Sequence, residues 1–267
     1  MTGNSLRAFD SIADRIRQHR QVSKAPLLVV EGPDDLLVLE GHLAGVEIFG
    51  ATGKPSVLEA LDRVDAWNLE RVYGLVDRDF DEVPTGGGAS RCFFYEGADL
   101  EAMLIDLGVM RHVLRHRGSS AKTSNSRTLD DVVSTIIECA RWVGLVRAAN
   151  GVHGWGLPFA EVSVASKVDR RSLDFDRRRF CDALRTACHS QVVPEGLYEL
   201  IDTEPSETAL YRGKDAAAMA GIALRAKLGS LSHSEATEEA IASAIRMSAD
   251  FLLDGSDWIS RLRAFVN

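Results

Sequence analysis

Short apolar runs alternate with amphipathic stretches in the first half of the chain. Four runs have the length and composition of strands: residues 27–30, 46–49, 71–76 and 92–95. Apolar residues recur at helical spacing at 6–22, 35–44 and 55–66, and from 100 to 107. Strands that alternate with helices predict right-handed crossovers and a mostly parallel sheet.

The pattern changes in the second half. The polar stretch 118–126 predicts a flexible connection, and residues 157–164 predict a short extended segment. Helices are predicted at residues 130–149, 176–190, 194–202, 215–229, 235–254 and 256–266. We therefore expect an α/β protein with three parts: an N-terminal helix (1–24), a Rossmann-like domain with a mostly parallel sheet (25–115) and a mainly helical C-terminal domain (116–267).

Acidic residues follow three of the predicted strands. Glu31 and Asp35 come after the first strand, Asp77 and Asp79 after the third, and Glu101 after the fourth. The carboxyl ends of parallel strands share one edge, so these carboxylates would repel each other unless a cation lay among them. In an extended chain, residues two apart point the same way, which would let Asp77 and Asp79 face one ion. Oxygen ligands favour Mg²⁺ or Mn²⁺, and two such ions suit phosphodiester hydrolysis.

Each of these motifs has an ordinary explanation when it occurs alone. A Glu-Gly pair after a strand is commonly a turn, and a D-x-D sequence is commonly a solvated loop; their combination at neighbouring strand ends favours a metal site. The glycine-rich residues 50–55 do not form a phosphate loop, because Ile48 stands at its first glycine position and Pro55 follows the lysine. Lys54 is a candidate contact for a substrate phosphate, with a plain turn as the alternative.

Composition restricts the mode of nucleic-acid binding. A net charge of −8 argues against a protein that coats nucleic acid through bulk electrostatics. It leaves room for local contacts, for which Arg111, Arg115 and Arg212 are the candidates. No apolar run has the length of a membrane span, and the four cysteines form no CxxC pair. We expect a cytoplasmic protein with buried thiols and no membrane association.

Three motifs together resemble the Toprim domain, which topoisomerases, bacterial primases, RecR and overcoming-lysogenization-defect (OLD) nucleases share. They are V-E-G-P-D-D at 30–35, L-V-D-R-D-F at 75–80 and Y-E-G-A-D-L-E at 95–101. With R-G-K-D at 212–215, they are more similar to OLD-like, stand-alone Toprim effectors of PARIS-type anti-phage systems than to primases or topoisomerases. That resemblance implies a metal-dependent nuclease acting on DNA or RNA, with transfer RNA as one candidate. It also implies control by a separate ABC-type ATPase, because this chain has no Walker A motif, and we expect a homodimer.

The resemblance also implies roles for individual residues. Glu31 would be a metal ligand or the general acid/base, and Asp77 and Asp79 would be metal ligands. Asp35 and Glu101 would serve a second ion. Lys214 would stabilise phosphate charge.

One position departs from the family pattern. Pro33 stands where Lys or a small polar residue is common, so any catalytic lysine must be Lys54 or Lys214. The alternative function is a non-catalytic Toprim module that binds nucleic acid or a protein partner. A receiver-like regulator is disfavoured, because no lysine ends the fourth strand.

Overall fold

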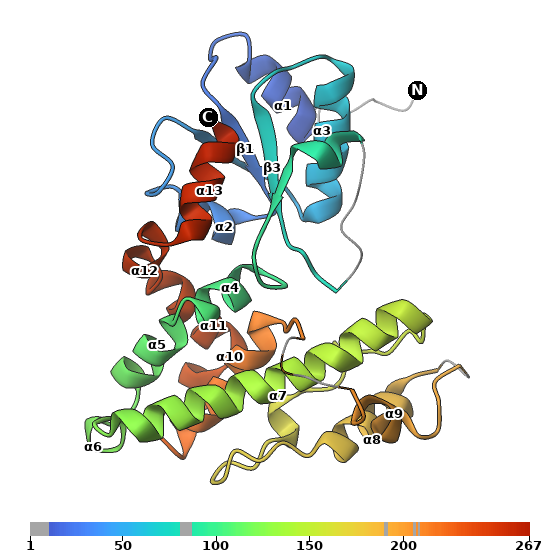
Figure 1. The fold of residues 1–267 in the computed structure, drawn as a ribbon, viewed down its shortest axis with the longest axis vertical. Coiled ribbons are helices and arrows are strands. Elements are labelled where there is room, and N and C mark those ends of the chain that lie inside the picture. The colour runs from blue at the N-terminus through green and yellow to red at the C-terminus, as the bar shows by residue number, and fades with distance from the viewer. Residues whose placement is uncertain (1–10, 81–86, 190–191, 205–206, 208) are drawn as a thin grey trace, which may run out of the picture. The chain divides into compact units, whose positions relative to one another are not determined.

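The structure is a computed structural model that describes residues 11–80, 87–189, 192–204, 207 and 209–267 (Figure 1). The chain forms two compact units. Unit 1 comprises the described residues of 1–78, 82–96 and 250–267, and unit 2 comprises those of 79–81 and 97–249. The predicted α/β class is confirmed, since a parallel four-stranded sheet occurs together with numerous helices.

The parallel sheet belongs to unit 1. Its strands lie in the order β2 (Glu47–Gly50), β1 (Leu27–Val30), β3 (Val72–Val76) and β4 (Cys92–Phe94). Val30, at the end of β1, pairs with Gly50 and Leu75 on the two flanking strands. The carboxyl ends of these three strands therefore share one edge, as the sequence predicts, and all four predicted strands closely match those observed.

Helices α1 (Ile12–His19) and α3 (Lys54–Ala66) cover one face of the sheet (Figure 1). Side chains alternate between the faces of a strand, so Leu27 and Val29 of β1 point into this layer. Ile16 of α1 and Leu61 of α3 are fully buried against them. This apolar layer holds β1, which Glu31 directly follows, and α3, whose first residue donates its N–H to Glu31.

Helix α13 (Asp257–Val266) contributes aromatic side chains to the opposite face. The Trp258 ring stacks on Tyr95 with 5.3 Å between centroids, and the Phe265 ring lies 5.1 Å from Tyr73 and 5.2 Å from Phe93. Parallel sheets are normally covered on both faces, and here the cover comes from the far end of the chain. Residues 250–267 thus join unit 1, which differs from the division predicted at residue 116.

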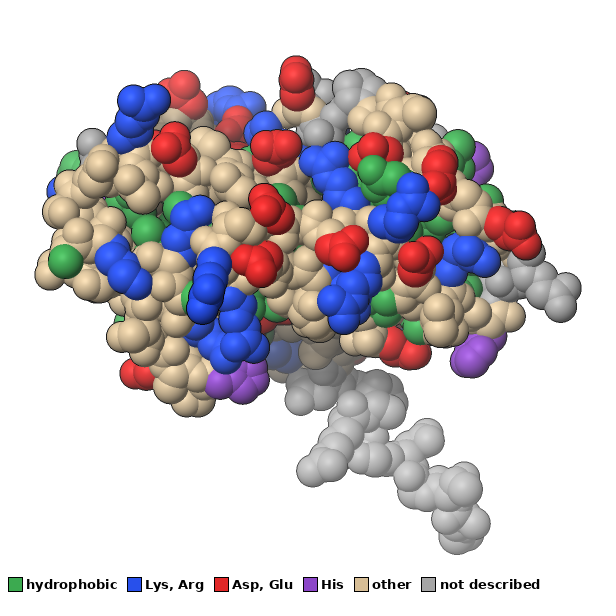
Figure 2. Space-filling model, turned by 90° about the horizontal axis from the view of Figure 1, so that it is seen from below, with side chains coloured by type: hydrophobic (Ala, Val, Ile, Leu, Met, Phe, Trp, Pro, Cys, Tyr) green, Lys and Arg blue, Asp and Glu red, His purple; other side chains and the backbone are tan. Residues whose placement is uncertain are grey.

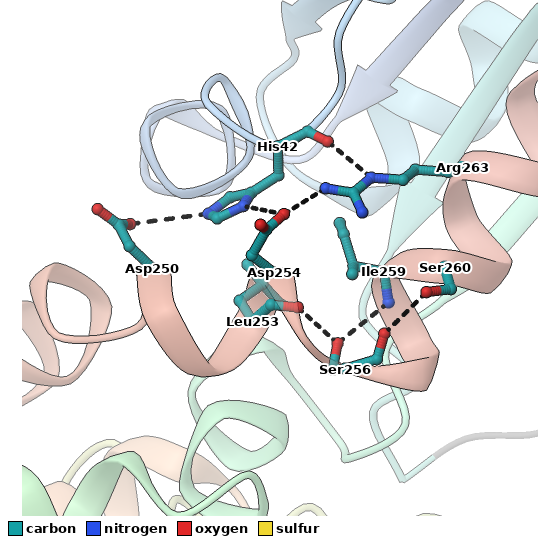
Figure 3. A network of polar contacts seen from close by, with 8 residues as sticks. All are labelled: His42, Asp250, Leu253, Asp254, Ser256, Ile259, Ser260 and Arg263. Atoms are coloured by element: carbon teal, nitrogen blue, oxygen red, sulfur yellow. Dashed lines mark hydrogen bonds and ion pairs between the residues drawn. The ribbon is translucent and has the colours of Figure 1, made fainter.

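A polar network fastens the C-terminal helices to the segment that follows α2 (Pro33–Leu39) (Figure 3). The His42 ring lies between two carboxylates, with Nε2 3.7 Å from Asp250 and Nδ1 3.5 Å from Asp254. Arg263 donates from Nε to the carbonyl oxygen of His42 at 3.0 Å and also pairs with Asp254. Both α12 (Asp250–Asp254) and α13 are held by these contacts.

Unit 2 consists of helices in its described part. They are α4 (Leu100–Asp106), α5 (Val109–Arg117), α6 (Ser120–Thr123), α7 (Ser126–His153), α8 (Arg177–Ala187), α9 (Leu197–Ile201), α10 (Gly213–Arg225) and α11 (Glu238–Met247), with short 3₁₀ turns at Ala165–Lys167 and Ser234–Ala236. Most of α10 is buried, and its small alanine side chains let α4, α7 and α11 approach it closely. Across the described residues, no helix has both the length and the apolar character needed to cross a membrane.

Some predicted elements differ from the structure. Residues 157–164 form turns and bends instead of an extended segment, and the connection at 118–126 contains the short helix α6. The helix predicted at 235–254 is divided into a 3₁₀ turn, α11 and α12, because the chain leaves unit 2 there and returns to unit 1. The N-terminal helix spans Ile12–His19, and the predicted start at residue 6 lies outside the described residues.

We expect Trp258→Ala to lower the free energy of unfolding by about 3–5 kcal/mol, because it removes a buried indole that covers the sheet. Phe251→Ala is the matched control: its ring is 89% exposed, so the change should be within about 0.5 kcal/mol. Urea unfolding of both variants measures the difference. Equal stability of the two variants would show that α13 does not support the sheet.

Candidate metal centre

The Glu31 carboxylate connects three elements at the carboxyl edge of the sheet. It directly follows β1, and its Oε1 accepts the N–H of Asp77, which directly follows β3, at 2.7 Å. Its Oε2 accepts the N–H of Lys54, the first residue of α3, at 3.0 Å. The positive end of the α3 dipole favours a negative charge at this place. The structure thus brings Glu31, Lys54 and Asp77 together, as the order of strands predicts.

Asp35 lies in the first turn of α2 and is 8% exposed. Its Oδ2 accepts the N–H of Gly32 at 2.9 Å, and its Oδ1 accepts the hydroxyl of Tyr95 at 2.6 Å. Pro33 is the first residue of this helix, where its missing N–H costs no hydrogen bond. Pro33 is therefore well accommodated at the start of α2.

The pKa of the buried Tyr95 hydroxyl is affected by the acidic residues around it. Burial raises the pKa of Tyr95 well above its usual value, and the charge of Asp35 and the hydrogen bond to it raise that pKa further. The charges of Asp77 and Glu31 act in the same direction. The negative charges of three carboxylates thus act in the same direction on the buried Tyr95 hydroxyl, and Asp35 also contacts it directly. We call Glu31, Asp35 and Asp77 the unit 1 acid cluster.

Asp79 belongs to unit 2 and has a different backbone environment. Its N–H donates to the carbonyl oxygen of Ala98 at 2.8 Å, and its φ is +55°. Strand β3 ends at Val76, so the chain is not extended through Asp79. The argument that Asp77 and Asp79 face one way because they share an extended strand is therefore wrong.

Glu101, the predicted ligand of a second ion, lies in the first turn of α4 and is buried in unit 2. It pairs with Arg246 of α11, which also pairs with Glu239 at 2.6 Å. Removing either partner of a buried ion pair leaves an uncompensated charge, so this contact stabilises the helix packing only as a pair. The negative charge of Glu101 is thus already balanced within unit 2.

Asp99 holds the beginnings of two helices in unit 2. Its Oδ1 caps α4 by accepting the N–H of Ala102 at 2.8 Å, and its two oxygens lie 3.1 and 3.0 Å from the N–H of Gly213 at the start of α10. A Cβ at Gly213 would lie 2.4 Å from both the Ala102 nitrogen and the Glu101 Cβ. The glycine in R-G-K-D is therefore required by this close approach of α10 to α4.

The other residues of R-G-K-D have separate environments. Asp215 accepts two hydrogen bonds from Arg147 of α7, at 2.9 and 3.0 Å, and is buried. Arg212 and Lys214 are partly exposed. Burial raises the pKa of Glu238 on α11, and the positive charges of Arg212 and Lys214 oppose that rise. Lys214 therefore lies in a mixed-charge region of unit 2, whereas Lys54 lies beside the unit 1 acid cluster.

The predicted basic contacts on α5 are exposed or partly exposed. Arg111 bonds Asp130 of α7 through Nε at 2.6 Å, which raises the pKa of Arg111, while Arg115 is exposed. Figure 2 shows one face of the molecule, on which Lys and Arg side chains are interspersed with Asp and Glu. That face fits local phosphate contacts better than binding through a broad positive field.

The unit 1 acid cluster fits a hard divalent cation by its donor chemistry. Among the residues that the structure describes, no group of three or more His, Cys, Asp or Glu side chains forms a ready set of metal ligands. Mg²⁺, however, commonly binds through one or two carboxylates and keeps several waters. A carboxylate has about four lone-pair sites, of which the N–H groups of Lys54 and Asp77 use two on Glu31.

Sequence reasoning missed Tyr95, Arg147 and Arg246. Tyr95 stands at the end of the last predicted strand, where an aromatic residue is normally interpreted as part of the hydrophobic core. A signal did exist, since it directly precedes the acidic motif E-G-A-D-L-E. The arginines carry no local signal, because Arg246 pairs with a glutamate 145 positions away.

Asp99 should make stability depend on pH. Burial, followed by the charge of Glu101, raises the pKa of Asp99 to about 7 from 3.8. The folded state thus binds a proton that the unfolded state has lost between about pH 4 and 7, so stability falls as pH rises through this window. The slope contributed by one group is at most about 1.4 kcal/mol per pH unit. In Asp99→Asn this contribution should vanish, which urea unfolding at several pH values measures; an unchanged slope would contradict the assignment.

Gly213→Ala should lower the free energy of unfolding by about 1–3 kcal/mol, because the added methyl group would overlap the backbone at Ala102. Gly41→Ala provides the control, since a Cβ there has no heavy atom within 4 Å. Thermal unfolding of both variants gives the comparison. A fully stable Gly213→Ala protein would disprove the close approach of α10 to α4.

Comparison with known proteins leaves the family open. No family model and no curated protein matches the chain. The Toprim resemblance therefore rests on the three acidic motifs and on R-G-K-D, and the nuclease roles that it implies are carried forward as a proposal. The local geometry of Glu31, Asp35 and Asp77 stands independently of that resemblance.

Proposed function

We propose that the chain is a divalent-metal-dependent nuclease of the Toprim type, which hydrolyses phosphodiester bonds in DNA or RNA. The observation that carries the proposal is the bond between the Glu31 carboxylate and the N–H of Asp77 at the ends of β1 and β3. This contact places two acidic motifs from separate strands side by side. Asp35 adds a third carboxylate to the same cluster.

The reaction adds water to the phosphorus atom and breaks one ester P–O bond, leaving a phosphomonoester and a free hydroxyl. A bound Mg²⁺ or Mn²⁺ would lower the pKa of a water molecule and offset phosphate charge. Glu31 and Asp77 would hold the ion. The two N–H donors on Glu31 stabilise its ionised form, which suits a metal ligand better than a proton acceptor.

The acidic residues support one bound metal ion better than two. The unit 1 acid cluster supports an ion at Glu31 and Asp77. A second ion, with Asp35 and Glu101 as ligands, has less support because Arg246 already balances the charge of Glu101. Lys54 is the better candidate for a lysine near the reaction, since its backbone already contacts Glu31.

The biological setting follows from the resemblance alone. We propose a toxic effector of anti-phage defence, with transfer RNA among its candidate substrates and a separate ABC-type ATPase as its regulator. A homodimer belongs to the same proposal. Arg115 on α5 and Arg212 beside α10 are exposed or partly exposed and would supply local phosphate contacts.

A cleavage assay with plasmid, single-stranded DNA and total transfer RNA tests the function. We expect cleavage with Mg²⁺ or Mn²⁺ that is lost with a chelator. Glu31→Ala and Asp77→Asn should each reduce the rate at least about 100-fold, because each removes an ionised oxygen ligand. Asp77→Asn is the cleaner variant, since the backbone N–H that binds Glu31 remains.

Glu40→Ala is the matched control, because it removes an exposed carboxylate at the other end of α2 and should leave the rate unchanged. The assay is run with and without the ATPase encoded beside the chain's gene, where one exists. Cleavage that persists in both Glu31→Ala and Asp77→Asn would rule out this site. Binding of nucleic acid without cleavage under any condition would favour the alternative, a non-catalytic binding module.

A further inference from the structure

Three segments of unit 2 that are far apart in the sequence carry seven Lys and Arg residues and a single acidic residue, Asp169. Residues 118–128 include α6, residues 165–173 begin with a 3₁₀ turn, and residues 225–233 begin at the last residue of α10. This balance of charge is opposite to that of the whole chain, whose net charge is −8.

Two lysine side chains connect these segments. The Nζ of Lys122 in α6 donates to the carbonyl oxygen of Ala226, the residue after α10, at 2.9 Å. The Nζ of Lys227 donates to the carbonyl oxygen of Ser172, also at 2.9 Å. Two exposed arginines directly precede Ser172. We call these four cations the unit 2 basic patch: Lys122, Arg170, Arg171 and Lys227.

The positive charges of the basic patch are available to a ligand. Within the described part of the chain, none of its four side chains forms an ion pair, whereas Arg147 and Arg246 elsewhere in unit 2 do. The Asp169 carboxylate accepts the N–H groups of Arg171 and Ser172 at 2.8 Å each, so its hydrogen bonds lie within its own turn. A lysine ammonium has three N–H donors, of which a carbonyl oxygen uses one in each lysine of the patch.

We propose that the unit 2 basic patch binds the phosphate backbone of a nucleic acid. This inference deepens the proposed function and rests on it for the identity of the ligand, which would be the substrate strand held outside the metal centre. A nucleic acid presents one negative charge per phosphate along its length, and separate Lys and Arg side chains can each contact one phosphate. The patch is distinct from Arg111, Arg115 and Arg212, the contacts predicted from the sequence.

The composition of this surface favours a nucleic acid over an anionic membrane. Helices that bind a membrane surface combine basic residues with large apolar side chains that enter the lipid. In the described part of the chain, the strongly exposed large hydrophobic side chains all lie outside the three segments; they are Val22, Leu37, Val152, Val192, Leu200, Met247 and Phe251. The segments instead expose serines such as Ser124, Ser172 and Ser232, and serine hydroxyls commonly bond phosphate oxygens.

The test measures binding of the full chain to a fluorescein-labelled single-stranded oligonucleotide and to labelled transfer RNA by fluorescence anisotropy, with a chelator present to prevent cleavage. The variant is the double substitution Arg170→Gln and Arg171→Gln, because both side chains are exposed. For the single strand, the slope of log affinity against log salt should become shallower by about 1.4, since each lost phosphate contact removes about 0.7. The dissociation constant should rise about 10- to 30-fold at about 0.1 M salt.

The matched control is the double substitution Arg178→Gln and Arg261→Gln. It changes the net charge by the same amount, but these two arginines already pair with Glu199 and Glu96. Exposed ion pairs contribute little to stability, so the control should stay folded, which circular dichroism verifies for both variants. We expect the control to bind both probes like the wild-type protein. An equal loss of affinity in the two variants would show an effect of bulk charge and would overturn the basic patch.

The remaining outcomes separate the patch from the nuclease. Unchanged affinity of the Arg170→Gln and Arg171→Gln variant for both probes would overturn the patch, even if the wild-type protein cleaves its substrate. Weaker binding by this variant, together with no cleavage by the wild-type protein under any condition, would refute the nuclease and support the patch. Binding to phosphatidylserine vesicles that this variant alone loses, with nucleic-acid affinity unchanged, would assign the patch to a membrane and overturn the proposal.

Discussion

The carboxylate of Glu31, bound by the N–H groups of Lys54 and Asp77, is the interaction on which the carboxyl edge of unit 1 depends. It follows β1 and accepts hydrogen bonds from the segment after β3 and from the first turn of α3. Backbone donors and the helix dipole stabilise its negative charge. The same charge adds to the repulsion among Glu31, Asp35 and Asp77. One side chain therefore links three elements at this edge and adds negative charge to it.

The parts of the fold with short-range patterns could be predicted from the sequence. The apolar run at Leu27–Val30 predicted the first strand, and the acids after it predicted where that strand ends. The proximity of Glu31 to Asp77 was also predictable, because parallel pairing fixes which strand ends meet. Contacts made over long separations could not be predicted. Trp258 stacks on Tyr95, and Arg246 pairs with Glu101. Both contacts arise from tertiary packing, which the local hydrophobic pattern does not predict. The D-x-D argument failed for a local reason, because Asp79 takes a left-handed backbone conformation just past the strand.

The buried acidic side chains of the two units have different hydrogen-bond and ion-pair partners. In unit 2, Glu101 and Asp215 are each paired with an arginine from another helix, so that their charges are compensated by the protein itself. Asp99 instead accepts backbone N–H bonds at the start of α4 and α10, and its burial beside Glu101 raises its pKa. In unit 1, Asp35 receives an uncharged hydroxyl from Tyr95. The printed hydrogen bonds of Asp35 thus come from a backbone N–H and a neutral hydroxyl, whereas those of Asp215 come from an arginine.

The return of residues 250–267 to unit 1 also sets an order of events during synthesis. The ribosome makes β4, then the whole of residues 97–249, and only afterwards the helix that covers the second face of the sheet. At ordinary rates of translation this interval is on the order of ten seconds. During that time the growing chain already contains Glu31, Asp77 and Tyr95, yet Tyr95 has no Trp258 to stack on. The second face of the sheet thus stays without this cover until residues 250–267 have been synthesised.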